Sequence, residues 1–232
     1  AWVKISASAT GWYHIMGKYK GSYPAQGWHM RVRDTGVIDY DIWVNDSRSE
    51  IISTINIKDG NWHHVALTRI QNTGEMKLYI DGKLDVSGTG TISSADNSLT
   101  FNIGGRGNND TAENWLGYID EPRISNIART PEEIKLAAQR RPYGVYTSQV
   151  INLGTTPQSW NNFTWTESGV ATGDGETVAN NSGLVAQWNF NATTSTATAT
   201  NDAGSCGASC NGTLTGFANT TGQDVIAGSG WT

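Results

Sequence analysis

Two aspartates, Asp39 and Asp41, have the spacing at which a strand presents paired carboxylates on one face. Cleavage of a glycosidic bond with retention of configuration uses two carboxyl groups about 5 to 5.5 Å apart. The alternating Ile38, Tyr40 and Ile42 form an apolar face, so we expect both acids on the opposite, solvent-facing side. Two acids on a surface strand do not by themselves define an active site, and we predict no catalysis.

Aromatic residues could bind a different kind of ligand, because sugar rings pack on exposed aromatic faces with polar neighbours. Trp43 lies on the strand face opposite the apolar residues, and Trp12 and Tyr13 are expected in a loop. We therefore predict Trp43, Trp12 and Tyr13 as candidate ligand-binding residues. The alternative, packing within the sheets, is favoured for four other tryptophans: Trp28, Trp62, Trp165 and Trp188.

Two histidines, His63 and His64, are adjacent, so on a strand their side chains point to opposite faces and cannot hold one metal ion together. We expect them to pack and to form hydrogen bonds.

The two cysteines, Cys206 and Cys210, are four residues apart. The chain has no other cysteine, and no histidine lies near them, so a zinc site lacks ligands. A disulfide would stabilise this loop by about 2 kcal/mol and would indicate an oxidising, extracellular setting. The alternative is a pair of free thiols or half of a metal site. We predict the disulfide.

Charge is distributed unevenly along the 232 residues. All 16 Lys and Arg lie in residues 1–141, together with 16 of the acids, whereas residues 142–232 hold five acids and no Lys, Arg or His. A segment without cations cannot contact phosphates, so nucleic acid and anionic membrane surfaces are not expected as partners. No apolar run approaches the roughly 20 residues that cross a bilayer, so membrane insertion is not expected either.

The hydrophobic pattern predicts antiparallel strands. Apolar and polar residues alternate from Trp28 to Val44, with a turn at residues 34–36. Asp81-Gly82 predicts a tight hairpin after residues 76–80. Two further strands are predicted at 144–152 and 160–166, followed by a linker at 167–183.

One short helix is predicted to begin after Thr130. Pro131 takes the first helical position, and Glu133 lies three residues after the cap, which completes a capping box. The helix is expected to end near Arg140.

Five motifs fall into two groups. DGNWHHVALT at 59–68, MKLYIDG at 76–82 and GYIDEPRISNIAR at 117–129 are similar to the second half of a laminin-G-like domain of the concanavalin-A-like lectin/glucanase superfamily. GLVAQWNFN at 183–191 and DAGSCGASCNGTLTG at 202–216 resemble its first half. The resemblance implies an all-β fold, an antiparallel jelly-roll β-sandwich with one short helix, whose parts are in permuted order.

The resemblance also bears on cofactors and catalysis. It implies a structural Ca²⁺ held by Asp120, Asp202 and Asn211, whose oxygens are the ligands that this ion takes. The loop centre CGASC departs from the family, so the disulfide could replace the ion there. The glucanase branch carries a Glu-x-Asp-x-x-Glu run, which Asp39 and Asp41 do not extend into.

The order of the motifs predicts three parts: residues 1–141 as the C-terminal portion of one sandwich, 142–182 as a two-strand connector and linker, and 183–232 as the N-terminal portion of a second sandwich. Neither portion can bury its apolar face alone. The chain could be a fragment of a tandem array, could close on itself as a circular permutant, or could complete the next subunit head-to-tail.

We therefore expect a non-enzymatic, structural or adhesive protein located outside the cell or at its surface. Its expected partners are copies of itself, which it could join by strand complementation into a filament. The alternative is a carbohydrate-binding module of a larger protein, with glycans as partners.

Overall fold

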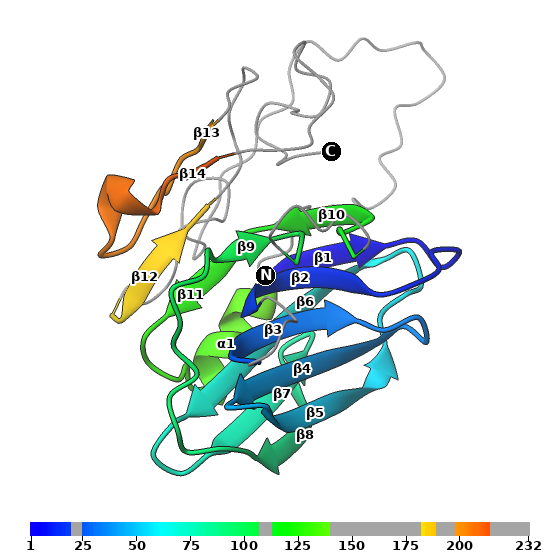
Figure 1. Cartoon of the computed structure of the whole chain (residues 1–232). Coiled ribbons are helices and arrows are strands. Elements are labelled where there is room, and N and C mark those ends of the chain that lie inside the picture. The colour runs from blue at the N-terminus through cyan, green and yellow to red at the C-terminus, as the bar shows by residue number, and fades with distance from the viewer. Residues whose placement is uncertain (20–24, 107–112, 140–181, 189–197, 214–232) are drawn as a thin grey trace, which may run out of the picture.

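The computed structural model of the chain describes residues 1–19, 25–106, 113–139, 182–188 and 198–213. The predicted strands at 144–152 and 160–166 and most of the predicted linker lie outside these residues. The described part is built from two five-stranded antiparallel sheets that pack face to face (Figure 1). The predicted fold class, a β-sandwich with one short helix, is confirmed.

The first sheet has the strand order β10-β1-β6-β7-β8. Its strands are β1 (Trp2–Ile5), β6 (Trp62–Ile70), β7 (Glu75–Ile80), β8 (Lys83–Thr89) and β10 (Gly117–Asp120). The predicted hairpin joins β7 to β8, where Asp81 and Gly82 have φ values of 51° and 77°, as a tight two-residue turn requires.

The second sheet has the strand order β5-β4-β3-β2-β9. Its strands are β2 (Tyr13–Tyr19), β3 (Gly27–Val32), β4 (Val37–Val44), β5 (Ser47–Asn56) and β9 (Asn102–Ile103). Asn45 and Asp46 join β4 to β5 with positive φ values, a turn that the sequence analysis did not recognise. The expectation that Tyr13 lies in a loop is wrong, because this residue begins β2.

The core lies between the two sheets and follows the predicted alternation. Ile38, Tyr40 and Ile42 of β4 are buried there against Val65 and Leu78 of the first sheet. Next to α1 and β11 a partly open pocket of about 510 Å³ lies between the sheets, and Leu184 forms part of its wall.

The helix α1 (Pro131–Gln139) forms as predicted. The backbone N–H of Glu133 donates to the Thr130 hydroxyl at 3.2 Å, and the Glu133 carboxylate accepts from the Thr130 N–H at 2.9 Å. This reciprocal pair is the predicted capping box, and it satisfies two backbone donors at the start of the helix.

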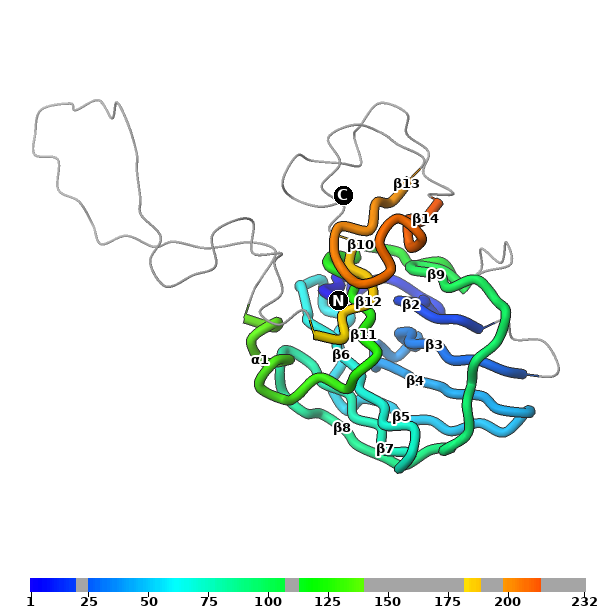
Figure 2. Tube along the Cα trace, turned by 90° about the vertical axis from the view of Figure 1, so that its left-hand side faces the viewer, coloured from blue at the N-terminus to red at the C-terminus, as the bar shows by residue number. Residues whose placement is uncertain are grey.

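Two distant parts of the sequence meet at the strand pair of β11 (Arg123–Ser125) and β12 (Leu184–Gln187). Ile124 is opposite Ala186, so the motif that begins at Gly183 pairs with the motif at 117–129 within one chain. Figures 1 and 2 both show β12 beside β11 at one edge of the sandwich. A small extension of β13 (Thr198–Ala199) and β14 (Gly212–Thr213) follows.

The residue after β12, Trp188, anchors this late segment. Its ring stacks on Phe101 with a centroid distance of 6.2 Å, and its indole Nε1 donates to the Cys210 carbonyl at 3.0 Å. The predicted disulfide between Cys206 and Cys210 is present and packs against the same ring. Residues 182–188 and 198–213, which we call the late segment, are therefore attached to the sandwich by backbone pairing and by one buried aromatic side chain.

Replacing this anchor tests how strongly the late segment contributes to stability. Trp188→Ala should lower the free energy of unfolding by about 3–5 kcal/mol, because a large buried ring is removed. Trp12→Ala, at a residue that is 36% exposed, should cost about 1 kcal/mol or less. Urea denaturation followed by circular dichroism measures both. Equal losses would show that the late segment is not docked through Trp188.

Candidate functional site

The polar face of the second sheet is formed by strand alternation. Asp39 and Asp41 point away from the core, on the side that we call the outer face. In the strand register Asp39 lies opposite Arg31, and Asp41 lies opposite both His29 and Glu50. Charged side chains from β3, β4 and β5 are thereby brought into one row across the sheet.

Arginines cover the two aspartates. The Asp39 carboxylate accepts hydrogen bonds from Arg31 at 3.2 Å and from Arg33 at 3.0 Å. Asp41 accepts from Arg48 at 2.6 Å and forms a hydrogen bond with His29 at 2.8 Å. The expectation that both acids face solvent is wrong, because their side chains are only 0% and 1% exposed.

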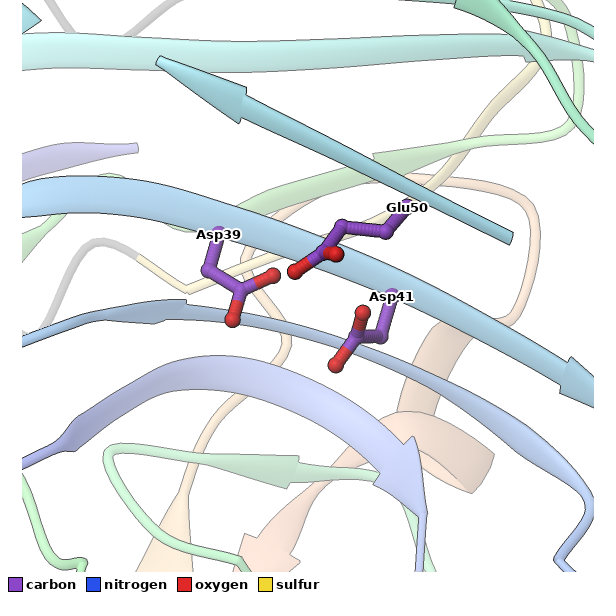
Figure 3. Close-up of side chains that lie close together, drawn as sticks. All are labelled: Asp39, Asp41 and Glu50. Atoms are coloured by element: carbon purple, nitrogen blue, oxygen red, sulfur yellow. The ribbon is translucent and has the colours of Figure 1, made fainter. Parts of the chain in front are cut away.

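Glu50 completes a group of three acids, and its carboxylate lies beside those of Asp39 and Asp41 (Figure 3). Arg33 and Arg48 both donate to Glu50. Burial raises the pKa of Glu50, as does the nearby Asp39, against the opposing effect of Arg48. Burial alone would also raise the pKa of Asp41, but hydrogen bonds from His29 and Arg48 outweigh it and lower that pKa.

Two buried histidines extend the network toward β2. Burial lowers the pKa of His14 to about 3, with further lowering by His29 and Arg31. Burial also lowers the pKa of His29. Both imidazoles are therefore neutral at pH 7, and the His14 Nε2 forms a 2.6 Å hydrogen bond with Glu113.

The three acids have ligand atoms within 4.8 Å of one another, the kind of group that could hold a metal ion. Each carboxylate already accepts from at least one guanidinium group. A cation would have to displace these arginines and overcome their repulsion. The donor set at this position therefore does not fit a metal ion.

The same contacts bear on catalysis. The three carboxylates are close enough to act on one bond, and the pKa shifts of Asp41 and Glu50 have opposite directions, as an acid–base pair requires. Asp39 and Asp41, however, lie beneath guanidinium groups and do not reach solvent. A molecule that approaches this face meets arginine and tryptophan side chains first.

Two of the three aromatic residues that were predicted to bind a ligand, Trp12 and Trp43, are on this face. Trp12 lies beneath the guanidinium groups of Arg31 and Arg33, at 4.2 and 5.2 Å from the ring centroid. Trp43 stacks on Tyr19 at 6.1 Å and lies beneath Arg48 at 5.8 Å.

The third predicted residue, Tyr13, is placed differently. It is buried in a small cluster with Ile5 and Ala9, and its hydroxyl donates to the Thr10 carbonyl.

Sequence reasoning missed Arg48 and Glu50 because it did not predict strand β5. The available signal was Asn45-Asp46, two residues that tolerate positive φ, directly after an alternating strand. A hairpin at this point places Arg48 and Glu50 two residues apart, on the same face as Asp41.

The predicted calcium ligands lie around the late segment. The pairing of Arg123 with Gln187, and the hydrogen bond from the Asp202 N–H to the Gln187 carbonyl, bring the loop toward the chain that follows Asp120. Asp120 is buried, and its Oδ1 accepts from the Glu121 N–H at 2.8 Å.

The third predicted ligand, Asn211, is already engaged within the loop. Its amide oxygen accepts from the Asn201 N–H at 2.8 Å. Carboxylate and amide oxygens are present in this region, but the Asn211 amide oxygen already accepts a hydrogen bond from within the loop.

The predicted packing is found at His64 and the predicted side-chain hydrogen bonds at His63, whereas the buried Nδ1 of His64 has no hydrogen-bond partner among the described residues. His64 is buried with its ring against Trp2, and burial lowers its pKa well below the usual value. His63 lies between Asp81 at 2.9 Å and Asp59 at 3.1 Å. The hydrogen bond that His63 donates to the Asp81 carboxylate is the main reason that the pKa of His63 is raised.

The chain belongs to the laminin G-like branch of the concanavalin A-like lectin/glucanases superfamily, whose family pattern matches residues 1–135. The resemblance seen in the three motifs at 59–68, 76–82 and 117–129 is thereby confirmed.

Among curated proteins, the chain is 32% identical over 123 residues to the mouse sushi, von Willebrand factor type A, EGF and pentraxin domain-containing protein 1. This match covers 49% of the chain and 3% of the mouse protein. A rat protein of the same name is 29% identical over the same length. The chain thus spans a small part of these relatives.

Among solved structures, a candidate carbohydrate-binding protein from Bacteroides ovatus has a TM-score of 0.55 at 18% identity, covering 87% of this chain and 48% of that one. A pentraxin from Limulus polyphemus has a TM-score of 0.45 at 18% identity, covering 60% and 68%. The first of these likenesses supports the sandwich fold. No helix in the described part of the chain is long and apolar enough to cross a membrane.

The buried acid of this network should be more important for stability than an exposed one. Asp41→Asn keeps the shape but removes the charge that Arg48 and His29 contact, and should lower the free energy of unfolding by about 3–5 kcal/mol. Asp96→Asn, in the exposed pair with Lys18, should leave it unchanged. Urea denaturation at pH 7 measures both. If Asp41→Asn left the free energy of unfolding unchanged, the arginines would not depend on this carboxylate.

Proposed function

We propose that the chain is a non-enzymatic extracellular adhesive domain that binds a glycan on the outer face of its second sheet. The observation that carries the proposal is the joint presence of half-exposed aromatic rings and guanidinium groups on that face. The Bacteroides ovatus structure, by its name, concerns carbohydrate binding, which agrees with this assignment.

Two chemical features of the face suit a sugar. Aromatic rings give apolar area to the C–H face of a pyranose, and such rings are supplied by Trp12, which is 36% exposed, and by Trp43, which is stacked on Tyr19. Arginine and carboxylate groups around them supply donors and acceptors for hydroxyl groups, fixed in place by their mutual hydrogen bonds. A glycan would therefore meet a surface that is organised before binding.

The absence of catalysis is part of the proposal. An acid–base pair must reach the scissile bond, and the covered carboxylates of Asp39 and Asp41 do not. The extracellular location is supported by the Cys206–Cys210 disulfide and by the sushi and EGF modules in the names of the curated relatives.

Glycan binding should depend on the aromatic face. Trp43→Ala should weaken binding at least about tenfold, because stacking on a ring contributes roughly 1 kcal/mol or more. Trp62→Ala, on the first sheet, should bind as the unchanged chain does. A broad glycan array followed by calorimetry on each hit measures this. An array with no hit would contradict the proposed function.

A second candidate function is assembly by strand complementation, and the pairing of β11 with β12 favours it. The same main-chain hydrogen bonds would form if β12 came from a neighbouring copy instead of from the same chain. Such an exchange is head-to-tail and propagates into a filament. The division into residues 1–141, 142–182 and 183–232 belongs to this proposal.

Calcium would act at the same junction. Asp120 and Asp202 would supply carboxylate oxygens. Asn211 would supply its amide oxygen if the hydrogen bond from the Asn201 N–H were broken. An ion held in this way would fasten residues 202–211 to the end of β10.

Negative-stain electron microscopy at several concentrations, in calcium and in chelator, tests assembly. This proposal expects regular filaments that shorten or disappear in chelator, because the carboxylates at the junction would then repel each other. A chain that ends at residue 182 should form none. Monomer-sized particles at every concentration would contradict strand exchange, and filaments from the truncated chain would contradict donation by β12.

A further inference from the structure

Strand β6 is paired along only part of one of its edges. On one side it pairs with β7 over residues 65–70. On the other side β1 pairs only with residues 62–64, and the main chain of Ala1 exchanges hydrogen bonds with Val65. Within the part of the chain that the structure describes, no strand pairs with residues 66–70 on this second side. The first sheet therefore has an open slot along the second half of β6.

The main-chain groups that face the slot follow from the alternation of an antiparallel strand. The Val65 N–H donates to the Ala1 carbonyl at 2.9 Å, so the main chain of Val65 points toward the side of the slot. Two and four residues later, Leu67 and Arg69 point their N–H and C=O groups the same way. These four groups have no hydrogen-bond partner among the described residues. An unpaired edge of this kind is a template for a further strand.

The pocket of about 510 Å³ lies in this slot. Five consecutive residues of β6, 65–69, line it. Successive side chains of a strand point to opposite faces, so a space lined by all five lies at the edge of the strand and not on one face. Because β7 takes the other edge, the pocket is at the open one. Its floor is the inner face of the second sheet, and its roof is α1, with the lining residues Met16, Trp28, Met30, Tyr40 and Ile42 below and Ile134 and Ala137 above.

A strand in this slot would be covered on both faces. Its positions opposite Leu67 and Arg69 would face the floor, because Leu67 packs against the core between the sheets. Its positions opposite Ala66 and Thr68 would face α1, which contacts β6. Large apolar side chains suit the first two positions, and small or hydroxyl-bearing side chains suit the second two, where Thr68 is itself buried.

A buried polar atom at the slot also lacks a partner. His64 lines the pocket and is 6% exposed, and its Nδ1 has no hydrogen-bond partner in the described part of the chain. Burial holds the pKa of His64 well below its usual value, so the neutral imidazole can form one hydrogen bond through this atom. The position opposite Ala66 is on the same face as His64, at the diagonal distance that cross-strand side chains span. A hydroxyl group at that position would therefore complete the histidine.

We propose that the slot beside β6 binds an extended polypeptide segment of a partner protein. The segment adds as an antiparallel strand that runs in the direction of β1, with apolar side chains opposite Leu67 and Arg69 and a hydroxyl side chain opposite Ala66. A lipid chain would cover the apolar floor but would leave the four main-chain groups unpaired, which favours a polypeptide. The proposal does not depend on glycan binding, because the outer face is on the other side of the second sheet.

The probe is the peptide acetyl-Lys-Ile-Thr-Ile-Ser-amide, whose residues would lie opposite residues 70 to 66 in that order. Amide hydrogen exchange of the unmodified chain, followed by NMR, measures its binding. At saturating peptide the Leu67 and Arg69 amides should exchange at least about tenfold more slowly, because each would donate to the peptide. The Ile42 amide, in a strand that is paired on both sides, should be unchanged.

The matched control is the same peptide N-methylated at both isoleucines. It keeps the side chains but lacks the N–H groups that would donate to the Leu67 and Arg69 carbonyls, so it should give no protection. Replacing the peptide's serine by alanine should weaken binding about fivefold, because the hydrogen bond to the His64 Nδ1 is lost.

Three results would overturn the proposal. The first is no protection by the parent peptide, or equal protection by the N-methylated one. The second is protection of both amides before any peptide is added, which would show that a second copy or residues outside the described part already fill the slot. The third is binding of dodecanoate in the pocket while the peptide gives no protection, which would assign the space to a small apolar molecule.

Discussion

The outer face of this sandwich depends on the burial of two carboxylates, Asp39 and Asp41, on the side of the sheet that lacks a second layer. A buried carboxylate costs several kcal/mol unless it is paired and hydrogen-bonded. Arg31, Arg33 and Arg48 provide these partners. The arginines in turn cover Trp12 and Trp43, so one electrostatic requirement fixes the positions of the aromatic residues too.

The other notable edge of the molecule is the pair of β11 and β12, which joins two segments that lie far apart in the sequence. Within the described residues, the segment around β12 takes its place beside β11, and Trp188 fastens it through Phe101 and the disulfide loop. The strands β11 and β12 are therefore complementary inside a single chain. The outer face is built entirely from strands within the first half of the sequence, so a ligand on that face and a partner at the β11–β12 edge would occupy separate surfaces.

The sequence predicts the elements that have strong local signals. The alternation in β4, the Asp81-Gly82 turn and the capping box at Thr130 each depend on neighbouring residues, and each is confirmed. The burial of Asp39 and Asp41 could not be predicted, because it requires arginines from β3 and β5 whose register is set by tertiary structure. Alternation predicts a face, but it does not show which long side chains will cover that face.

The predicted site residues divide in the same way. Trp43 is placed by the alternation of its own strand, whereas Tyr13 lies at the start of a strand whose alternation a bulge interrupts near His14. The loop at 202–211 has a recognisable motif, but the hydrogen bond between Asn201 and Asn211 depends on how the loop closes around its disulfide.

The most direct test of the outer face as the binding surface is a ¹H–¹⁵N NMR titration that follows the indole N–H signals of the tryptophans. We expect the Trp43 signal, and the Nε–H signals of Arg33 and Arg48, to shift as a glycan selected on the array is added, while the buried Trp188 indole, bonded to the Cys210 carbonyl, stays unchanged. Shifts at Trp188 with none at Trp43 would place the ligand at the late segment and contradict the account.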